Sequence, residues 1–161
     1  MIPHVSTPEK AQMLADSVKF PPIGDRGIDG AGLDCDFMLK GGEGYTDDAN
    51  AQTFLVVQIE TLEAVENVDA IAAIEGVDGI FVGPGDLGLR IKNTDTDQTL
   101  EGCIETVAAA CKKHGKPWGI PAATPEILQK RKAQGAQLLA HGGDFGCFFE
   151  MMKQYVSHFD A

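Results

Sequence analysis

Two acidic residues follow two short apolar segments, and their types and spacing are suited to holding a cation. Glu60 ends the run 54–59, and Asp86 lies just beyond the run 79–82. Short β-branched runs separated by a helical pattern, here 61–75, are typical of a βαβ unit with parallel strands. The carboxyl ends of parallel strands meet at one edge of a sheet, where α/β folds bind their ligands. We therefore expect Glu60 and Asp86 to be neighbours.

The two carboxylates admit a chemical and a structural interpretation. As ligands, they would form a partial set for Mg²⁺ or Mn²⁺, completed by water and substrate oxygens, and the ion would polarise a carbonyl group. As structural groups, Glu60 could cap a helix that starts near Thr61, and Asp86 could close its own turn. The residue types alone leave both interpretations open.

The segment 83–88, Gly-Pro-Gly-Asp-Leu-Gly, matches the G-x-G-x-x-G pattern of dinucleotide sites. That fingerprint requires a helix to begin at the turn, so that free N–H groups face the pyrophosphate. Residues 89–97 are polar and poorly periodic, which predicts no such helix and disfavours a dinucleotide site. We expect instead a sharp turn with the N–H groups of Gly85 and Asp86 open to a small anion.

Composition excludes several classes of function. The chain has 161 residues, of which 43% are hydrophobic, which is enough for the core of one ordinary domain. A net charge of -11 with only 13 scattered basic residues disfavours nucleic acid as a partner. No apolar run approaches the roughly 20 residues that cross a bilayer, and the start resembles no signal peptide. We predict a cytoplasmic protein with no membrane partner.

The cysteines and histidines show no metal-binding spacing. No two cysteines form a C-x-x-C pair, and Cys103 and Cys111 fall on the apolar face of an expected helix. We expect four reduced cysteines, mostly in the core. The segment 141–144 follows the last expected strand, where a turn is favoured over a substrate contact.

Strand and helix patterns alternate along the chain, which predicts one α/β domain over residues 1–161. The expected strands are 2–5, 54–59, 79–82, 118–120 and 137–140, and the expected helices are 7–18, 61–75, about 100–114, 124–134 and 148–158. The Gly- and Asp-rich stretch 20–52 is too long for an ordinary connection. We interpret it as a functional or intersubunit loop with one short helix around 33–40.

Several segments together resemble one enzyme family. Residues 57–61, Val-Gln-Ile-Glu-Thr, and residues 76–87, Gly-Val-Asp-Gly-Ile-Phe-Val-Gly-Pro-Gly-Asp-Leu, are similar to the signature of the HpcH/HpaI aldolases. Residues 20–27 resemble the loop that precedes this signature, and residues 1–5 and 65–73 are more similar still to a fungal member of the family. The resemblance extends over nearly the whole chain and is to metal-dependent pyruvate aldolases.

This resemblance implies a function and a set of site residues. It makes Glu60 and Asp86 the ligands of a divalent ion, Mg²⁺, Mn²⁺ or Co²⁺, with Gln58 beside them. The backbone amides of Gly85 and Asp86 would receive the carboxylate of pyruvate or oxaloacetate. The implied activity is that of a carbon-carbon lyase: aldol cleavage or condensation, or decarboxylation, of a 2-oxo acid through a metal-stabilised enolate and without a Schiff base.

The resemblance also implies that part of the family fold is missing. The family members are (β/α)₈ barrels, and this chain aligns from their fourth strand onward, so we expect an incomplete TIM-type barrel of about five βα units. The missing units carry the family's catalytic histidine and arginine. His4 and Arg26 align with other positions, so no catalytic residue is assigned.

An incomplete barrel would leave open strand edges, which proteins normally cover or pair. We therefore expect a homo-oligomer, a complementing chain, or a fragment of a longer protein. The alternative function is a catalytically degenerate binding or interaction module on the same scaffold.

Overall fold

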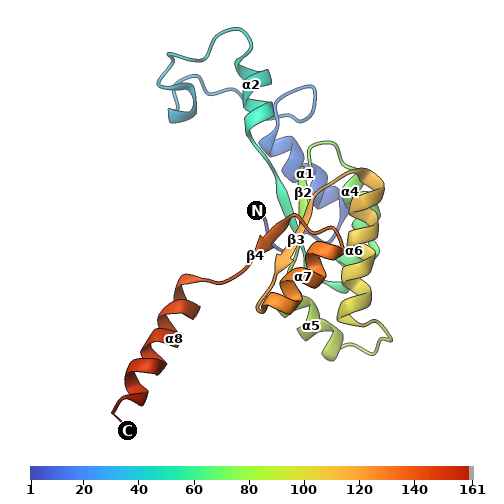
Figure 1. The fold of residues 1–161 in the computed structure, drawn as a ribbon. Coiled ribbons are helices and arrows are strands. Elements are labelled where there is room, and N and C mark those ends of the chain that lie inside the picture. Colours follow the sequence, from blue (N-terminus) through green and yellow to red (C-terminus); the bar gives the residue numbers. More distant parts are fainter. Residues whose placement is uncertain (160–161) are drawn as a thin grey trace.

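A computed structural model describes residues 1–159 and shows an α/β architecture built on one parallel sheet. The sheet has four strands in the order β1-β2-β3-β4, so each strand pairs with the next in sequence (Figure 1). Their bounds are β1 Val56–Ile59, β2 Gly79–Val82, β3 Trp118–Pro121 and β4 Leu138–Ala140. All three pairings are parallel, as the alternation of strand and helix patterns predicts.

Eight α-helices and one short 3₁₀ helix complete the described part of the chain. They are α1 Pro8–Val18, η1 Leu33–Cys35, α2 Tyr45–Gln52, α3 Leu62–Glu66, α4 Val68–Ala73, α5 Pro84–Lys92, α6 Leu100–His114, α7 Pro125–Ala133 and α8 Asp144–Ser157. Figure 1 shows α4, α6 and α7 together on one side of the sheet. Within residues 1–159, no helix is both long and apolar enough to cross a membrane.

The core lies between the sheet and these helices. Val57, Ile59, Ile80 and Val82 alternate along β1 and β2 and are fully buried. The residues between them face the other way, and the register partners Gln58 and Phe81 are only half-buried. The sheet therefore has one covered face and one partly open face.

Four helices begin at a threonine whose hydroxyl accepts a hydrogen bond from a backbone N–H three residues on. The pairs are Thr7 with Lys10, Thr61 with Ala64, Thr99 with Gly102, and Thr124 with Ile127. Such caps satisfy N–H groups that have no partner inside the helix. The predicted starts of α1 and α7 are confirmed.

The structure corrects several expected elements. The helix expected over 61–75 is broken at Asn67, whose side-chain amide donates a hydrogen bond to the carbonyl of Ser6 at 2.9 Å. Helix α8 begins at Asp144, four residues earlier than expected. The strand expected over 2–5 is reduced to an isolated bridge between Ile2 and Val57, so four strands replace the expected five.

The stretch 20–52 contains a helix that was not predicted. Helix α2 is polar and buries none of its residues, so no apolar periodicity marks it. It is anchored by Asn50, whose side chain accepts from the N–H of Phe20 at 2.7 Å and donates to its carbonyl at 3.0 Å. The short helix expected around 33–40 is only the 3₁₀ turn η1.

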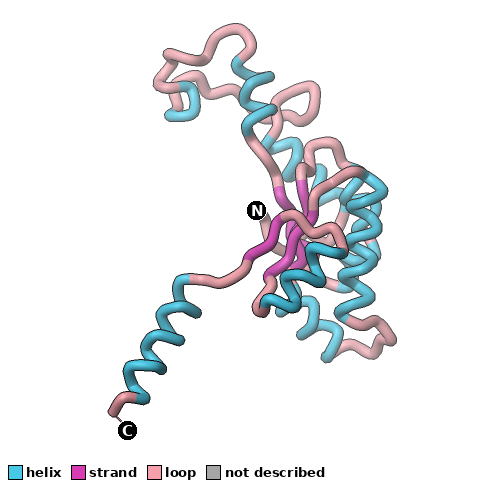
Figure 2. Tube along the Cα trace, in the orientation of Figure 1, coloured by secondary structure: helices cyan, strands magenta, loops and turns pink. Residues whose placement is uncertain are grey.

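Two segments extend away from the sheet and its helices: the one that contains α2, and helix α8 (Figure 2). No residue of α8 is buried, and Phe145 is 75% exposed. Phe148 and Phe149 pack against each other but are also exposed. The apolar side chains of α8 therefore have no core of their own chain to enter.

The four cysteines are free, as expected. Cys35, Cys103 and Cys111 are buried, whereas Cys147 is exposed on α8. Burial raises the pKa of the Cys103 thiol and raises that of Cys111 to about 12, because the thiolate would lose its hydration. The Cys111 thiol therefore behaves as a small apolar group in the core, whereas the Cys103 thiol donates a hydrogen bond to Oε1 of Gln98 at 3.2 Å.

Helix α7 is attached to α6 mainly through charge. Its one buried residue is Arg131, whose guanidinium donates two hydrogen bonds to the Glu101 carboxylate at 2.8 and 2.9 Å. Lys130 lies 2.9 Å from the same carboxylate. Arg131 lowers the pKa of Glu101 to about 2, with smaller contributions from Lys130 and Gln134.

We predict that Glu101→Gln lowers the free energy of unfolding at pH 7 by roughly 1–2 kcal/mol, because the buried Arg131 loses a charged acceptor. Since the pKa of Glu101 is lowered from 4.5 to about 2, the pair's contribution is complete above about pH 4.5 and is lost as the pH falls toward 2. Urea unfolding at pH 7, 4 and 3 should show the two proteins converging. The exposed Glu105→Gln on the same helix is the control, and an equal effect of both changes would contradict the prediction.

Candidate functional site

Glu60 is a buried carboxylate at the carboxyl end of β1. It is 4% exposed, and its Oε1 accepts a hydrogen bond from the backbone N–H of His4 at 2.7 Å. The hypothesis that Glu60 caps the following helix is wrong, because Thr61 caps α3. Burying a carboxylate costs free energy unless its oxygens have hydrogen-bonding or charged partners. The residues around Glu60 must therefore accommodate its carboxylate.

Gly83 provides the space for the second oxygen of Glu60. The register pairs Ile59 with Val82, so Glu60 and Gly83 are the next residues on the two strands. A Cβ atom at Gly83 would lie 2.6 Å from Oε2 of Glu60 and 2.9 Å from its Cβ. Only glycine therefore allows β2 to pass this close to the carboxylate.

A helix begins directly after Gly83, contrary to the expectation for segment 83–88. Helix α5 has proline at its first position and places Gly85 and Asp86 in its first turn. The sequence analysis missed it because Leu87 is its one buried residue, so no apolar stripe marks it. The first N–H groups of a helix have no intrahelical acceptor and lie at the positive end of its dipole.

This correction removes the argument that the missing helix gave against a dinucleotide site. A second requirement still argues against it: the fingerprint needs an acid at a strand end about 20 residues on. The corresponding region, around Cys103, lies inside helix α6. The open N–H groups of Gly85 and Asp86 are therefore better suited to a small anion than to a nucleotide.

The structure brings Asp86 to the same sheet edge as Glu60 but leaves its carboxylate exposed. The Asp86 side chain is 55% exposed and lies 3.3 Å from Nη1 of Arg90, one helical turn later. Such exposed i,i+4 pairs contribute only about 0.3–0.5 kcal/mol, so other partners can compete for the carboxylate. Within residues 1–159, no group of three or more His, Cys, Asp or Glu side chains is arranged to hold a metal.

Gln58 lies two residues before Glu60 on β1 and therefore faces the same side of the sheet. Its backbone N–H donates to the carbonyl of Ile2 at 2.9 Å, and its carbonyl accepts from Val5 at 3.3 Å. The half-buried side chain thus sits on the partly open face, below Glu60. The expected grouping of Gln58 with the carboxylates is compatible with this placement.

The remaining polar and aromatic residues near the sheet have structural contacts. The Nδ1 atom of His141 lies 2.6 Å from the carbonyl of Ala122, which fixes the turn after β4. Gly142 has a positive φ of 78° in the same turn. Trp118 is 3% exposed and belongs to the core.

His4 is the residue at this site that the sequence analysis did not select. Its backbone is left-handed, with φ of 56°, and its Nδ1 lies 3.6 Å from Oε1 of Glu60. No local sequence signal marks it, because glycine is the usual sign of a positive φ. Only the position of β1 beside residues 2–5 reveals the contact.

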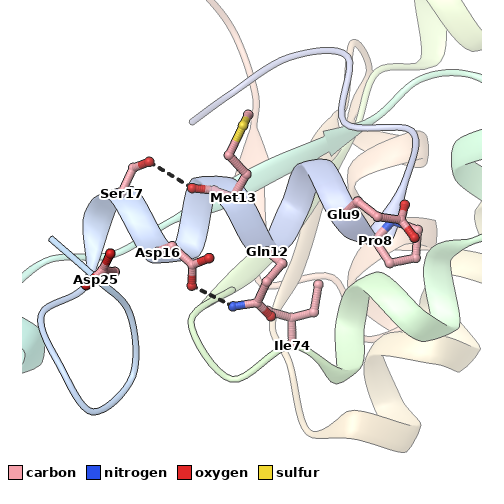
Figure 3. Close-up of a pocket in the computed structure, with 8 residues that line it drawn as sticks. All are labelled: Pro8, Glu9, Gln12, Met13, Asp16, Ser17, Asp25 and Ile74. Atoms are coloured by element: carbon pink, nitrogen blue, oxygen red, sulfur yellow. Dashed lines mark hydrogen bonds between the residues drawn. The ribbon is translucent and has the colours of Figure 1, made fainter.

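A separate groove runs along α1 and contains none of the predicted site residues. Figure 3 shows Asp16 accepting a hydrogen bond from Gln12 and Ser17 donating one to the carbonyl of Met13, at 2.8 Å each. The other lining residues are Pro8, Glu9, Asp25 and Ile74. It is open and carries three carboxylates without a basic side chain, so the sheet edge remains the candidate site.

Comparison with known proteins shows which family the chain belongs to. Residues 1–150 match the family described as HpcH/HpaI aldolase/citrate lyase. The chain belongs to this family. A 2-keto-3-deoxy-L-rhamnonate aldolase from Klebsiella pneumoniae is 32% identical over 167 residues, a match that includes 100% of this chain and 61% of the relative. The chain thus spans about three fifths of the length of such relatives.

Solved structures of the family have the same fold. A family protein from Burkholderia cenocepacia superimposes with a TM-score of 0.85 at 28% identity, over 99% of this chain and 64% of that one. Macrophomate synthase superimposes with a TM-score of 0.76 at 23% identity, over 98% of this chain and 56% of that one. Macrophomate synthase is the fungal family member that residues 1–5 and 65–73 resemble, and the two proteins share this fold.

For this family member, we predict that Gly83→Ala disturbs the site locally. The added methyl group would overlap Oε2 and Cβ of Glu60, which is too buried to move away freely, so the free energy of unfolding should fall by about 1–3 kcal/mol. Thermal unfolding checks this. Gly85→Ala, whose added Cβ would meet no atom within 4 Å, is the matched control and should change stability by less than about 1 kcal/mol. Equal losses in both variants would contradict the prediction.

Proposed function

We propose that this chain carries the cation and carboxylate half of an aldolase site for a small 2-oxo acid such as pyruvate or oxaloacetate. The observation that carries the proposal is the buried carboxylate of Glu60, held beside the first turn of α5 at the carboxyl edge of the sheet. A negative group and open N–H groups at one edge suit a cation and an anionic substrate together. Membership of the HpcH/HpaI family supports this reaction class.

The residues at the sheet edge fit a divalent ion. Oε2 of Glu60 lies in the space that the missing side chain of Gly83 leaves, and Asp86 has an exposed carboxylate within the first turn of α5. Two carboxylates completed by water and substrate oxygens are a usual donor set for Mg²⁺ or Mn²⁺. Glu60 and Asp86 would hold the ion, which when bound would polarise the 2-oxo group and favour the enolate form of the substrate.

The chain's own groups would orient the substrate. The N–H groups of Gly85 and Asp86 would donate to its carboxylate, at the positive end of the α5 dipole. Gln58, on the same face as Glu60, would contact the substrate or a water at the ion. Holding the carboxylate and the 2-oxo group in fixed positions is what directs bond cleavage to the carbon next to the carbonyl.

We propose further that the sheet is an incomplete TIM-type barrel whose open parts are covered by other polypeptide. The sheet has four strands, β4 lies at one edge, and the other edge next to β1 is paired only through the short segment around Ile2. Its face with Gln58 and Phe81 is partly open. Open edges and faces of this kind are normally paired or covered.

The covering polypeptide would be a second copy of this chain or a complementing chain. Helix α8 supports this proposal, because it extends away from the sheet and its helices (Figure 1). Its Phe145, Phe148 and Phe149 side chains are exposed. An exposed apolar helix face marks an interaction surface or an aggregation-prone segment. A second copy could bury this face without any change in the chain itself.

The proposed activity predicts Mn²⁺-dependent decarboxylation of oxaloacetate above the rate with free Mn²⁺. Glu60→Gln combined with Asp86→Asn should reduce the rate to that of free Mn²⁺, because both proposed ligands lose their charge. Glu63→Gln, which changes an exposed carboxylate on α3, should leave the rate unchanged. Oxaloacetate loss and pyruvate formation are both measured.

The two possible results have separate meanings. A rate that depends on Glu60 and Asp86 supports an enolate-forming site. A rate equal to free Mn²⁺ in the unaltered protein would contradict catalysis by this chain alone and would favour a binding module on the aldolase scaffold.

The proposed association predicts a mass above that of a monomer in analytical ultracentrifugation. Replacing Phe145, Phe148 and Phe149 together by serine should shift the protein toward monomer, because these side chains supply the exposed apolar area. Replacing the exposed but separate Met13 by serine is the control. A stable monomer in the unaltered protein would overturn the proposal.

A further inference from the structure

The segment 2–6 runs beside β1 without forming a strand of the sheet, apart from the bridge at Ile2. The N–H of Ile2 donates to the carbonyl of Val56, the N–H of Gln58 donates to Ile2, and the N–H of Val5 donates to Gln58. Between these backbone bonds, the N–H of His4 donates to Oε1 of Glu60 at 2.7 Å rather than to a backbone carbonyl of β1. The segment thus donates one hydrogen bond to a side chain at the sheet edge.

His4 has a left-handed backbone conformation at the point where its N–H is directed to the Glu60 side chain. Its φ of 56° lies in the region that β-branched residues adopt at a high cost but that His, Asn and Gly tolerate. Contacts on both sides hold the turn in place. The Lys10 ammonium donates to the carbonyl of His4 at 2.7 Å, and the hydroxyls of Ser6 and Thr61 lie 2.8 Å apart.

The imidazole of His4 contributes less to this contact than the backbone does. Its Nδ1 is 3.6 Å from Oε1 of Glu60, beyond the distance of an ordinary hydrogen bond, and the side chain is 54% exposed. The backbone N–H is closer by 0.9 Å, the difference between 3.6 and 2.7 Å. The His4 amide bonds to Oε1, whereas Oε2 lies against Gly83 and, among the described residues, accepts no hydrogen bond.

We propose that His4 is a positioning residue for Glu60, acting through its backbone amide rather than through its imidazole. The left-handed turn directs the N–H to Oε1 and presents Oε2 to a cation. This inference rests on the proposed role of Glu60 as a ligand. It predicts that the backbone conformation available at position 4, and not the histidine side chain, determines how well the site binds Mn²⁺.

Mn²⁺ binding, followed by electron paramagnetic resonance, tests this with substitutions that separate backbone from side chain. His4→Gly and His4→Asn keep the left-handed turn and should bind within about threefold of the unaltered protein. His4→Val disfavours the turn and should bind about tenfold more weakly, the usual loss when a group that orients a ligand is disturbed. Phe37→Val, at another left-handed residue on a different segment, is the control and should not change binding.

Two outcomes of the Mn²⁺-binding measurement would overturn the proposal. Equal binding by His4→Val and the unaltered protein would overturn the proposal, and so would losses in His4→Gly and His4→Asn as large as the loss in His4→Val, since the imidazole would then matter. If the unaltered protein binds Mn²⁺ no better than Glu60→Gln does, the proposed ligand role of Glu60 fails first.

Hydrogen exchange tests the hydrogen bond without a metal and without a variant at position 4. The amide of His4 should exchange at least about tenfold faster in Glu60→Ala than in the unaltered protein. The amide of Val5, which donates to the carbonyl of Gln58, should be unchanged and serves as the control. Equal exchange of the His4 amide in both proteins would overturn the proposal even if His4→Val does not fold.

Discussion

The structure at the sheet edge depends on one constraint: a carboxylate buried at the end of β1 needs a donor on one side and space on the other. The donor is the backbone N–H of His4, whose backbone conformation is left-handed, and the space exists because Gly83 has no side chain. Both conditions follow from strand pairing, because residues 2–5 run along one side of β1 and β2 lies in register on the other. Without these neighbours, burial of the Glu60 carboxylate would destabilise the folded protein.

The surrounding elements fix this edge in position. Threonine caps start α1 and α3 next to this edge. The side chain of Asn67, between α3 and α4, donates a hydrogen bond to the carbonyl of Ser6, which precedes α1. Below the edge, buried aliphatic side chains on β1 and β2 hold the register against the helices. Small shifts are therefore resisted by a close-packed core. Above this edge, the carboxylate of Asp86 is exposed and, among the described residues, bonded only to Arg90 in its own helix.

Much of this arrangement could be predicted from the sequence, because it rests on local patterns. The β-branched runs predicted parallel strands, the helix starts expected at Thr7 and Thr124 are those of α1 and α7, and Glu60 lies at a strand end as expected. Helix α5 was missed because its single buried residue makes no stripe, and α2 because it buries nothing. The role of His4 could not be predicted, since its contact joins residues 56 positions apart and depends on a backbone angle that no residue type requires.

The central claim, that Glu60 presents Oε2 to a divalent ion at this edge, is tested most directly by anomalous diffraction from a crystal of the protein grown with Mn²⁺. The account predicts a manganese peak within about 2.0–2.3 Å of Oε2 of Glu60, with the His4 amide still bonded to Oε1. The Asp86 carboxylate should have turned from Arg90 toward the peak. A peak at another site, or no peak near Glu60 at millimolar Mn²⁺, would contradict the account.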